Sequence, residues 1–418
     1  MTGRLVTGPP WPRAALRWGR GQLLYALAYL WRSLLWRTTF VGVTGSVGKS
    51  TTKECLAAVL ALCGPTARTP HNQNDRLGVP RTLLRVRPWH RFAVVEVATE
   101  RPGMLARSAR LLRPDIAVVL AVARTHTNNF ASLDDAAAEK ACLVEVLSRQ
   151  GVAVLNAEDP RVHAMAGRCR GHVRTFGRSL GADVWADEVY SRWPQRLSLR
   201  VHAGDRCQPV QTELVGEHWA NAVLAVLCVA QAAGIPLATA AASLARVPPF
   251  AGRMQPVRLV SGATLIRDEE NGSPDALEAA LQLLRQTEAT RRILVLSDVS
   301  DSRQKTRTRL RRLGQAAAGA ADLVLFVGPH AHHGVAGALA AGMSPERVVG
   351  IAELPAAAAY LRALLRPGDV VLLKGRSTDH LSRIVFALQG TVGCWRTRCD
   401  RRILCDLCDQ LEAQPTAG

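Results

Sequence analysis

Hydrophobic residues from position 38 onward occur in short runs that alternate with stretches of helical periodicity. The runs are bounded by polar or glycine-containing segments and are too short for typical helices, so they predict buried strands. A chain in which such strands alternate with helices is expected to form an α/β fold with mostly parallel sheets. The strands predicted in the first part of the chain are residues 40–45, 92–98, 116–122 and 152–157.

Changes in this pattern divide the chain into regions. Between residues 173 and 215 the runs are shorter and predict antiparallel strands. Residues 247–256, VPPFAGRMQP, are rich in proline and glycine and predict a linker. Later runs alternate with helices again and predict a second, Rossmann-like parallel sheet. The expected parts are an N-terminal segment (1–37), a central ATP-binding α/β domain (38–248), a C-terminal Rossmann-like domain (249–390) and a Cys-rich tail (391–418).

The N-terminal segment is basic and rich in tryptophan, and it lacks acidic residues, since the first acid of the chain is Glu54. Its longest uncharged run, residues 21–31, is shorter than the roughly 20 apolar residues that span a bilayer. No small-residue cleavage site follows, which argues against a signal peptide. We therefore expect a cytoplasmic protein whose first 37 residues either lie on the inner membrane surface as an amphipathic helix or pack against the domain behind them.

The formal net charge of +19 does not by itself indicate a nucleic-acid-binding protein. The arginines are spread along the whole chain, so the charge raises the isoelectric point without indicating a nucleic-acid surface, and we expect no nucleic-acid partner. Lysine is scarce among the 53 basic residues. The five lysines are Lys49, Lys53, Lys140, Lys305 and Lys374.

Four of the ten cysteines are clustered near the C-terminus. Without a secretory signal they are expected to stay reduced, and a reduced cluster favours metal binding over disulfides. The spacing contains one Cys-x-x-Cys pair, so a structural Zn²⁺ site is the leading interpretation, with free thiols or an iron–sulfur cluster as alternatives. The candidate ligands are Cys394, Cys399, Cys405 and Cys408.

A phosphate-binding loop is predicted in VGVTGSVGKSTTKE, residues 41–54, which follows a strand and precedes a helix. Its glycines let backbone amides curve around phosphates, Lys49 can reach the β- and γ-phosphates of ATP, and Ser50 can bind Mg²⁺. Val43 stands where the common phosphate loop has its first glycine. The expected ATP contacts are Thr44, Gly45, Ser46, Val47, Gly48, Lys49, Ser50 and Thr51.

Further motifs follow the loop in the order found in the Mur ligases, a family that this sequence resembles over about residues 38–390. The segments that carry the resemblance are TGSVGKSTTKE (44–54), NQNDRLGVPRTLL (72–84), VVEVATERPGML (94–105), ARTHTNNFASLDDAAAEKA (123–141), VLNAEDPRV (154–162), GEHWANAVLA (216–225), AGRMQPV (251–257), RDEENGSPDAL (267–277) and LLKGRS (372–377). It looks closest to the branch that joins D-alanyl-D-alanine to a UDP-muramoyl tripeptide.

The resemblance implies an ATP-dependent ligase of cell-wall or related polymer synthesis. Such an enzyme phosphorylates a carboxylate, and an amine then attacks the acyl phosphate to form an amide. Two Mg²⁺ ions are implied, the first held by Ser50 and Glu96, the second by His126 and Lys140. Lys140 would be carbamylated by CO₂, and only a primary amine forms a stable carbamate, so arginine could not replace it.

The resemblance also implies a nucleotide site between the two domains. His218 and Asn221, three residues apart on a predicted helix, match the adenine contacts of the family. Arg253 matches the residue that reaches the γ-phosphate, and Asp268 matches the aspartate that binds ribose. Lys374 matches the lysine that faces the cleft from a C-terminal-domain strand. The implied catalytic residues are Lys49, Glu96, His126, Lys140, Arg253 and Lys374.

The sequence departs from the family pattern in four places. Where the family reads Asp-Asp-Ser-Tyr-Asn-Ala-Asn-Pro, residues 267–274 read RDEENGSP, and Cys142 replaces a usual glutamate. Arg376 and Ser377 invert the usual Ser-Arg after the lysine. Fewer than 45 residues precede the phosphate loop, too few for the family's UDP-sugar-binding domain, so a carboxylate other than the standard UDP-muramoyl tripeptide is expected.

Rival functions remain open at this point. Within the class, the chain resembles poly-γ-glutamate synthetases and ligases that amidate lipid-linked cell-wall precursors, which also lack the front domain. A non-catalytic ATP-binding subunit of a membrane complex and a nucleic-acid-dependent ATPase are alternatives of other classes. Release of ADP that depends on both a carboxylate and an amine distinguishes the ligases from the other two.

Overall fold

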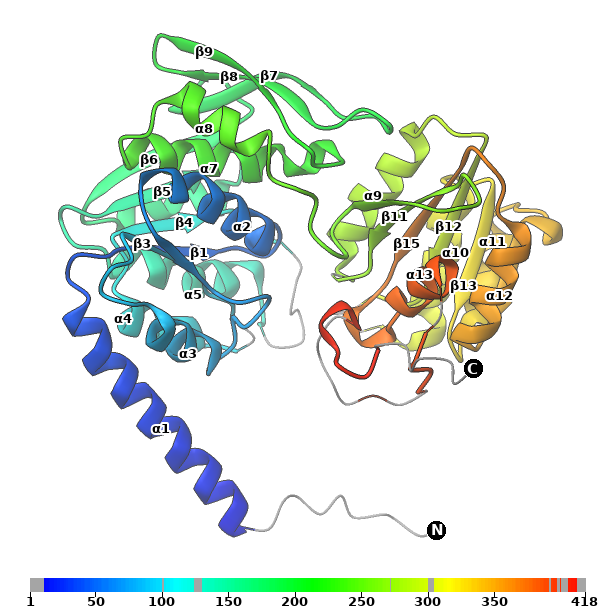
Figure 1. Ribbon diagram of the computed structural model, residues 1–418, viewed down its shortest axis with the longest axis horizontal. Helices are drawn as coiled ribbons and strands as arrows, with labels where there is room; N and C mark the ends of the chain where they lie inside the picture. The colour runs from blue at the N-terminus through cyan, green and yellow to red at the C-terminus, as the bar shows by residue number, and fades with distance from the viewer. Residues whose placement is uncertain are drawn as a thin grey trace, which may run out of the picture.

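The computed structural model describes residues 11–99, 101–123, 130–270, 272–299, 304–390, 392–396, 399 and 405–411, with side chains from residue 19 onward. Two α/β domains lie side by side, each built on its own mostly parallel sheet (Figure 1). This arrangement confirms the predicted fold class.

The central domain contains a nine-stranded sheet in the order β2-β3-β1-β4-β5-β6-β7-β8-β9. The strands from β2 to β7 run parallel, and β7, β8 and β9 pair as an antiparallel meander at one edge. The antiparallel prediction for residues 173–215 is thus confirmed for all but β6. The strands are β1 (Thr39–Thr44), β2 (Thr66–Arg68), β3 (Phe92–Glu96), β4 (Ile116–Val119), β5 (Val152–Asn156), β6 (His172–Gly177), β7 (Val184–Tyr190), β8 (Ser198–Ala203) and β9 (Arg206–Gln211).

Helices cover both faces of this sheet (Figure 1). Along β1, Val41 and Val43 enter the hydrophobic core beneath α2 and α7, whereas Phe40 enters the core beneath α3, α4 and α5. Alternate residues of a strand point to opposite faces, which explains why the run is hydrophobic throughout. The helices are α2 (Lys49–Leu60), α3 (Gly78–Arg85), α4 (Met104–Leu112), α5 (Leu133–Glu145), α6 (Pro160–His163), α7 (Ala220–Ala232) and α8 (Leu237–Leu244).

The C-terminal domain contains a six-stranded sheet in the order β10-β11-β15-β12-β13-β14. Only β10 runs antiparallel to its neighbour, so five strands form the open parallel sheet that the sequence predicts. Its strands are β10 (Gln255–Arg258), β11 (Thr264–Asp268), β12 (Arg291–Leu296), β13 (Leu323–Val327), β14 (Val348–Ile351) and β15 (Asp369–Lys374). Its helices are α9 (Pro274–Gln286), α10 (Thr306–Ala318), α11 (Ala331–Ala340), α12 (Leu354–Leu364) and α13 (Ser382–Gln389).

The N-terminal segment forms helix α1 (Trp11–Leu34), which runs away from the central domain at its N-terminal end (Figure 1). One side of its C-terminal half packs on the domain: the Trp31 indole donates to the Val86 carbonyl, and Arg32 donates to the Leu112 carbonyl. The other side carries Leu23, Leu27, Leu30 and Leu34, which are 61%, 48%, 64% and 67% exposed. Among the described residues, no helix combines the length and hydrophobicity needed to cross a membrane.

Candidate functional site

The phosphate loop joins β1 to α2 and turns on two glycines with positive φ. Gly45 (φ 149°) packs so tightly on the end of β4 that an added Cβ would lie 2.9 Å from Cβ of Leu120. Gly48 (φ 82°) directly precedes Lys49, the first residue of α2. Glycine tolerates these conformations, and the loop therefore presents backbone amides at a helix N-terminus, where an anion is favoured. The Lys49 ammonium lies 2.7 Å from the Gly45 carbonyl oxygen, inside the loop.

Glu96 and Ser50 meet beside this loop. Glu96 ends β3, the parallel neighbour of β1, and Ser50 lies in the first turn of α2. The Ser50 hydroxyl donates to Oε1 of Glu96 over 3.1 Å. The carboxylate is 1% exposed, and its Oε2 accepts no hydrogen bond among the described residues. A buried carboxylate oxygen without a donor, next to a hydroxyl, suits a hard cation such as Mg²⁺.

Two further side chains hold Glu96, and the predicted site did not include them. The Asn74 amide donates to Oε1 of Glu96 over 2.6 Å. The fully buried Lys53 ammonium lies 3.9 Å from Oε2 and donates to the carbonyls of Thr69 and His71. Asn74 belongs to a segment that resembles the family, and Lys53 is one of five lysines. Both signals were present in the sequence, but only the tertiary contacts reveal the role.

Lys140 is buried on α5, and only 4% of it is exposed. Burial and, to a smaller extent, the nearby Lys49 charge lower the pKa of its amine to about 8, against an opposing effect of Glu139. The Glu139 carboxylate itself accepts backbone hydrogen bonds from Gly103 (2.8 Å) and Leu105 (2.7 Å) at the start of α4. A lysine with a depressed pKa is neutral more often than an exposed one, and carbamylation requires the neutral amine.

A cavity between the two domains collects the predicted nucleotide contacts. The phosphate loop, the start of α7 and the linker contribute from one side, and β11 with α9 contributes from the other. Six predicted ATP residues therefore share one space, although they come from segments more than 200 residues apart. The residues that line it are Val47, Gly48, Leu120, Ala121, His218, Trp219, Asn221, Ala222, Arg253, Asp268, Asp275, Ala276 and Ala279.

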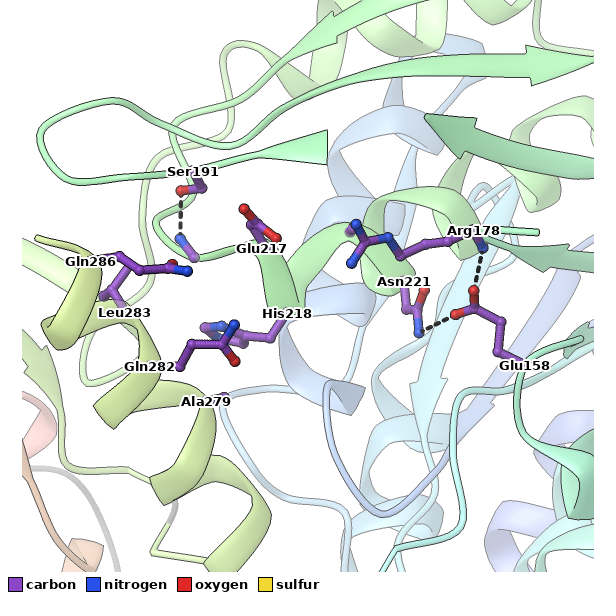
Figure 2. A pocket seen from close by; sticks show the side chains of 12 residues that line it. Glu158, Arg178, Ser191, Glu217, His218, Asn221, Ala279, Gln282, Leu283 and Gln286 are labelled. Carbon is purple, nitrogen blue, oxygen red and sulfur yellow. Dashed lines mark hydrogen bonds between the residues drawn. The ribbon is translucent and has the colours of Figure 1, made fainter. Parts of the chain in front are cut away.

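A more polar pocket adjoins this cavity at His218 and Asn221 (Figure 2). The Asn221 amide lies 3.5 Å from Oε2 of Glu158, whose Oε1 accepts from the Arg178 backbone. Gln282 of α9 reaches toward His218 from the other domain (Figure 2). His218 is exposed to solvent at the pocket wall, and partial desolvation by the surrounding protein together with the charge of Lys374 lowers the pKa of its imidazole, which is therefore neutral at pH 7. A neutral imidazole and amides suit the edge of a nucleobase.

Lys374 and Asp268 form a buried ion pair at the carboxyl ends of β15 and β11. The two residues are direct partners in the parallel register, and Nζ of Lys374 lies 2.5 Å from Oδ2 of Asp268. Lys374 is fully buried. Burial raises the pKa of Asp268, and the lysine opposes that shift. Asp268 lines the nucleotide cavity, whereas Lys374 supports it from behind.

Arg253 connects the linker to the phosphate loop. Its Nη2 donates to the Ser50 hydroxyl over 3.0 Å and lies 3.8 Å from Oε1 of Glu270. Glu270 in turn accepts from the Asn72 amide over 3.0 Å, so a second contact joins the domains. The predicted position of Arg253 near the γ-phosphate is consistent with this geometry.

The structure does not establish two parts of the predicted metal sites. His126 lies outside the described residues. Among the described residues, no group of three or more His, Cys, Asp or Glu side chains is arranged to hold a metal ion. In the tail, the Cys405 thiol lies 3.4 Å from Nδ1 of His380. The zinc site at Cys394, Cys399, Cys405 and Cys408 stays a prediction.

Two family models match the chain along its two domains. The Mur ligase middle domain matches residues 43–230, and the Mur ligase glutamate ligase domain matches residues 252–377. The UDP-N-acetylmuramoyl-tripeptide–D-alanyl-D-alanine ligase of Mycobacterium tuberculosis is 34% identical over 380 residues, which cover 86% of this chain and 74% of that one. The enzyme of the same name from Escherichia coli is 29% identical, covering 85% of this chain and 77% of that one.

Solved structures show the same fold. A crystal structure of MurF from Acinetobacter baumannii superimposes with a TM-score of 0.82 at 25% identity, covering 89% of this chain and 81% of that one. MurF ligase from Thermotoga maritima in complex with ADP gives a TM-score of 0.76 at 23% identity, covering 88% and 83%.

Proposed function

Because this chain belongs to the Mur ligase family of ATP-dependent amide ligases, we propose that it joins a carboxylate to the amino group of an amino acid or short peptide through an acyl phosphate. The product would serve cell-wall peptidoglycan or a related cell-surface polymer. The observation that carries the proposal is the convergence of Ser50, Glu96, Lys140 and Arg253 around one phosphate loop at the domain boundary. The curated relatives named above act, by their names, on a UDP-muramoyl tripeptide and D-alanyl-D-alanine.

The proposed reaction has two steps. A carboxylate oxygen attacks the γ-phosphorus of ATP, and ADP leaves. The amine nitrogen then attacks the acyl carbon, phosphate leaves with the broken C–O bond, and the nitrogen loses a proton to solvent. The loop amides and Lys49 hold the phosphates, and Arg253 offsets negative charge at the γ-phosphate. The domain boundary brings nucleotide and acceptor together, which lowers the entropy cost of reaction.

The residues beside the phosphate loop fit the first of the two Mg²⁺ ions that the family implies. Ser50 and Glu96 would hold the first, since the unsatisfied Oε2 of Glu96 is buried beside the hydroxyl. Lys140 and His126 would hold the second. When bound, the ions neutralise charge that would otherwise repel the carboxylate from the triphosphate.

Lys140 would contribute to the second ion as a carbamate. The neutral amine adds to the carbon of CO₂ and releases one proton, which converts a cationic side chain into an anionic one. At pH 7 an amine of pKa about 8 is neutral in roughly one molecule in ten, a far larger fraction than for an ordinary lysine. Burial beside Lys49 therefore favours the modification and also leaves an unmodified ammonium poorly accommodated.

A ligase that amidates a lipid-linked carboxylate is the second candidate, and helix α1 favours it. The exposed side of α1 presents four leucines spaced as one helical stripe, and the exposed Arg20 and Arg37 flank this stripe in the sequence, Arg20 within the helix and Arg37 just beyond its end. Apolar residues flanked by arginines are typical of helices that bind anionic membranes. Such a location would bring the site to a carboxylate carried on a lipid.

Release of ADP tests both candidates. The purified protein is incubated with ATP, Mg²⁺, an amine such as D-alanyl-D-alanine, and either UDP-muramoyl tripeptide or a lipid-linked precursor. We expect ADP release only when a carboxylate and an amine are both present, with the amide product identified by mass spectrometry. Equal ADP release without either substrate would contradict the proposed ligase function.

A further inference from the structure

The C-terminal tail returns to the domain boundary. The short helix η6 (Cys405–Leu407), drawn in red in Figure 1, lies on the side of the C-terminal domain that faces the central domain. Asp406 accepts two hydrogen bonds from Arg267, at 2.7 and 2.9 Å. Arg267 is 3% exposed and also pairs with the buried Glu269. A bidentate pair with a buried arginine is a strong anchor for a tail segment.

This anchor places the tail in a pocket next to the catalytic residues. Asp406 and Leu407 line the pocket together with residues of the central domain, including Ser50 and Asn72, and with Arg253 of the linker. Arg253 also lines the nucleotide cavity. The nucleotide cavity and this pocket therefore meet at Arg253, which donates to Ser50 of the pocket wall, so the tail-lined pocket adjoins the place where the γ-phosphate is expected.

The charges of the pocket indicate what it accepts. Three acids line it, and two of them are already paired: Glu54 with Lys53 and Arg68, and Asp406 with Arg267. Glu270 is paired only through Oε1, which lies 3.8 Å from Arg253 and accepts from Asn72, whereas its Oε2 has no hydrogen-bond partner among the described residues although the side chain is only 7% exposed. A buried carboxylate oxygen without a donor favours a cationic ligand group.

We propose that this pocket is the acceptor site, that the tail forms one of its walls through Asp406 and Leu407, and that Glu270 receives the ammonium group of the amine substrate. The inference rests on the proposed ligase function, since it assigns the second substrate of that reaction. It gives the tail a role in substrate binding, and it explains why Arg267 and Glu270 both stand where the family pattern has other residues. Arg267 anchors the tail through Asp406, and Glu270 provides the negative charge for the ammonium group of the amine.

Binding without turnover tests the acceptor site. The probes are D-alanyl-D-alanine, glycine, D-alanine and L-lysine, each compared with the analogue in which a hydroxyl replaces the α-amino group. Calorimetry is done with Mg²⁺ and a non-hydrolysable ATP analogue. We expect the best amine to bind at least about tenfold more tightly than its hydroxy analogue. Glu270→Gln should remove that preference while retaining the hydrogen bond from Asn72, since glutamine keeps the acceptor oxygen.

The tail is tested by Asp406→Asn, with Asp409→Asn as the matched control in the same segment. Asp406→Asn should weaken amine binding about tenfold and leave the affinity for the ATP analogue within twofold. It should also speed alkylation of the buried Cys405 thiol in native buffer, because the anchor to Arg267 is weakened. Asp409→Asn should match the wild-type protein in all three measurements.

The outcomes separate this inference from the proposed function. Faster alkylation of Cys405 with unchanged amine affinity would show an anchored tail outside the acceptor site and would overturn the inference. The same conclusion follows if no amine is preferred over its hydroxy analogue, or if Glu270→Gln alters only the Mg²⁺ requirement. Absence of ADP release by the wild-type protein would contradict the proposed function alone, because the binding measurements need no turnover.

Discussion

The nucleotide cavity and the proposed acceptor pocket, which meet at Arg253, are formed by different parts of the chain. The nucleotide cavity is formed largely by segments that match the Mur ligase pattern, such as the phosphate loop and the start of α7. The acceptor pocket combines Asn72, Glu270 and the tail, and two of these three depart from that pattern or lie beyond the family matches. ATP use is implied by the family, so we expect the specificity of this chain for its amine to depend on the proposed acceptor pocket.

Substitution of Lys140 should cause the largest loss of activity, because it affects the metal site next to the phosphate loop. Lys140→Ala removes the amine that would carry the carbamate and should reduce amide formation at least about 1,000-fold, while nucleotide affinity changes little because the phosphate loop is intact. Initial rates of ADP release and calorimetric binding of the ATP analogue measure the two effects.

Two related measurements make the Lys140 prediction specific. Lys140→Arg should be equally inactive, because a guanidinium keeps the charge but forms no carbamate. A small carboxylic acid such as acetate should restore part of the activity of the alanine variant. Full activity of the arginine variant would show that Lys140 is not modified.

Glu96→Gln should have the next largest effect. The amide keeps the size of the side chain but removes the charge that would hold the first Mg²⁺, so kcat should fall on the order of 100-fold and the Mg²⁺ concentration for half-maximal rate should rise. Glu278→Gln, an exposed acid on α9 paired with Arg285, is the control and should behave as wild type. An unchanged Mg²⁺ requirement in the Glu96 variant would place the metal elsewhere.

The dependence of activity on pH and on CO₂ should test whether Lys140 forms a carbamate. The folded pKa of Lys140 is lowered to about 8 from the ordinary 10.5, so the neutral amine increases as pH rises through 8 and decreases below it. At limiting bicarbonate, activity should therefore rise severalfold between pH 7 and pH 8.5, and saturating bicarbonate should flatten the profile. A rise that is insensitive to bicarbonate would indicate a different titrating group.

A change in helix α1 should affect neither the nucleotide cavity nor the proposed acceptor pocket. Replacing Leu23, Leu27, Leu30 and Leu34 by glutamine removes the exposed apolar stripe, and each leucine contributes about 1.5–3 kcal/mol when buried in an apolar phase. Co-sedimentation with anionic vesicles should fall at least about tenfold, while kcat with water-soluble substrates stays within twofold. Leu339→Gln, at an exposed leucine of α11, is the control. Unchanged sedimentation would remove the membrane interpretation of α1.

The sequence predicted those features that depend on neighbouring residues. The strands and the phosphate loop follow from hydrophobic runs and glycine spacing, and the structure contains them close to the expected positions. The family resemblance implied a place for Arg253 near the γ-phosphate, but its contact with Ser50, which spans 203 residues, was found only in the structure. The pair of Arg267 and Asp406 spans 139 residues in a region that departs from the family, so no sequence pattern indicated it. Contacts of this kind depend on how two domains meet.

The hydroxyl of Ser50 has one further consequence for the catalytic cycle. It donates to Glu96 and accepts from Arg253, so the arginine uses one of the two lone pairs of this oxygen. A Mg²⁺ ion held by Ser50 and Glu96 would use the other lone pair and would bring a second positive charge close to the guanidinium. Occupancy of the metal site would therefore weaken the contact between the linker and the phosphate loop, so the two would be coupled through one hydroxyl group.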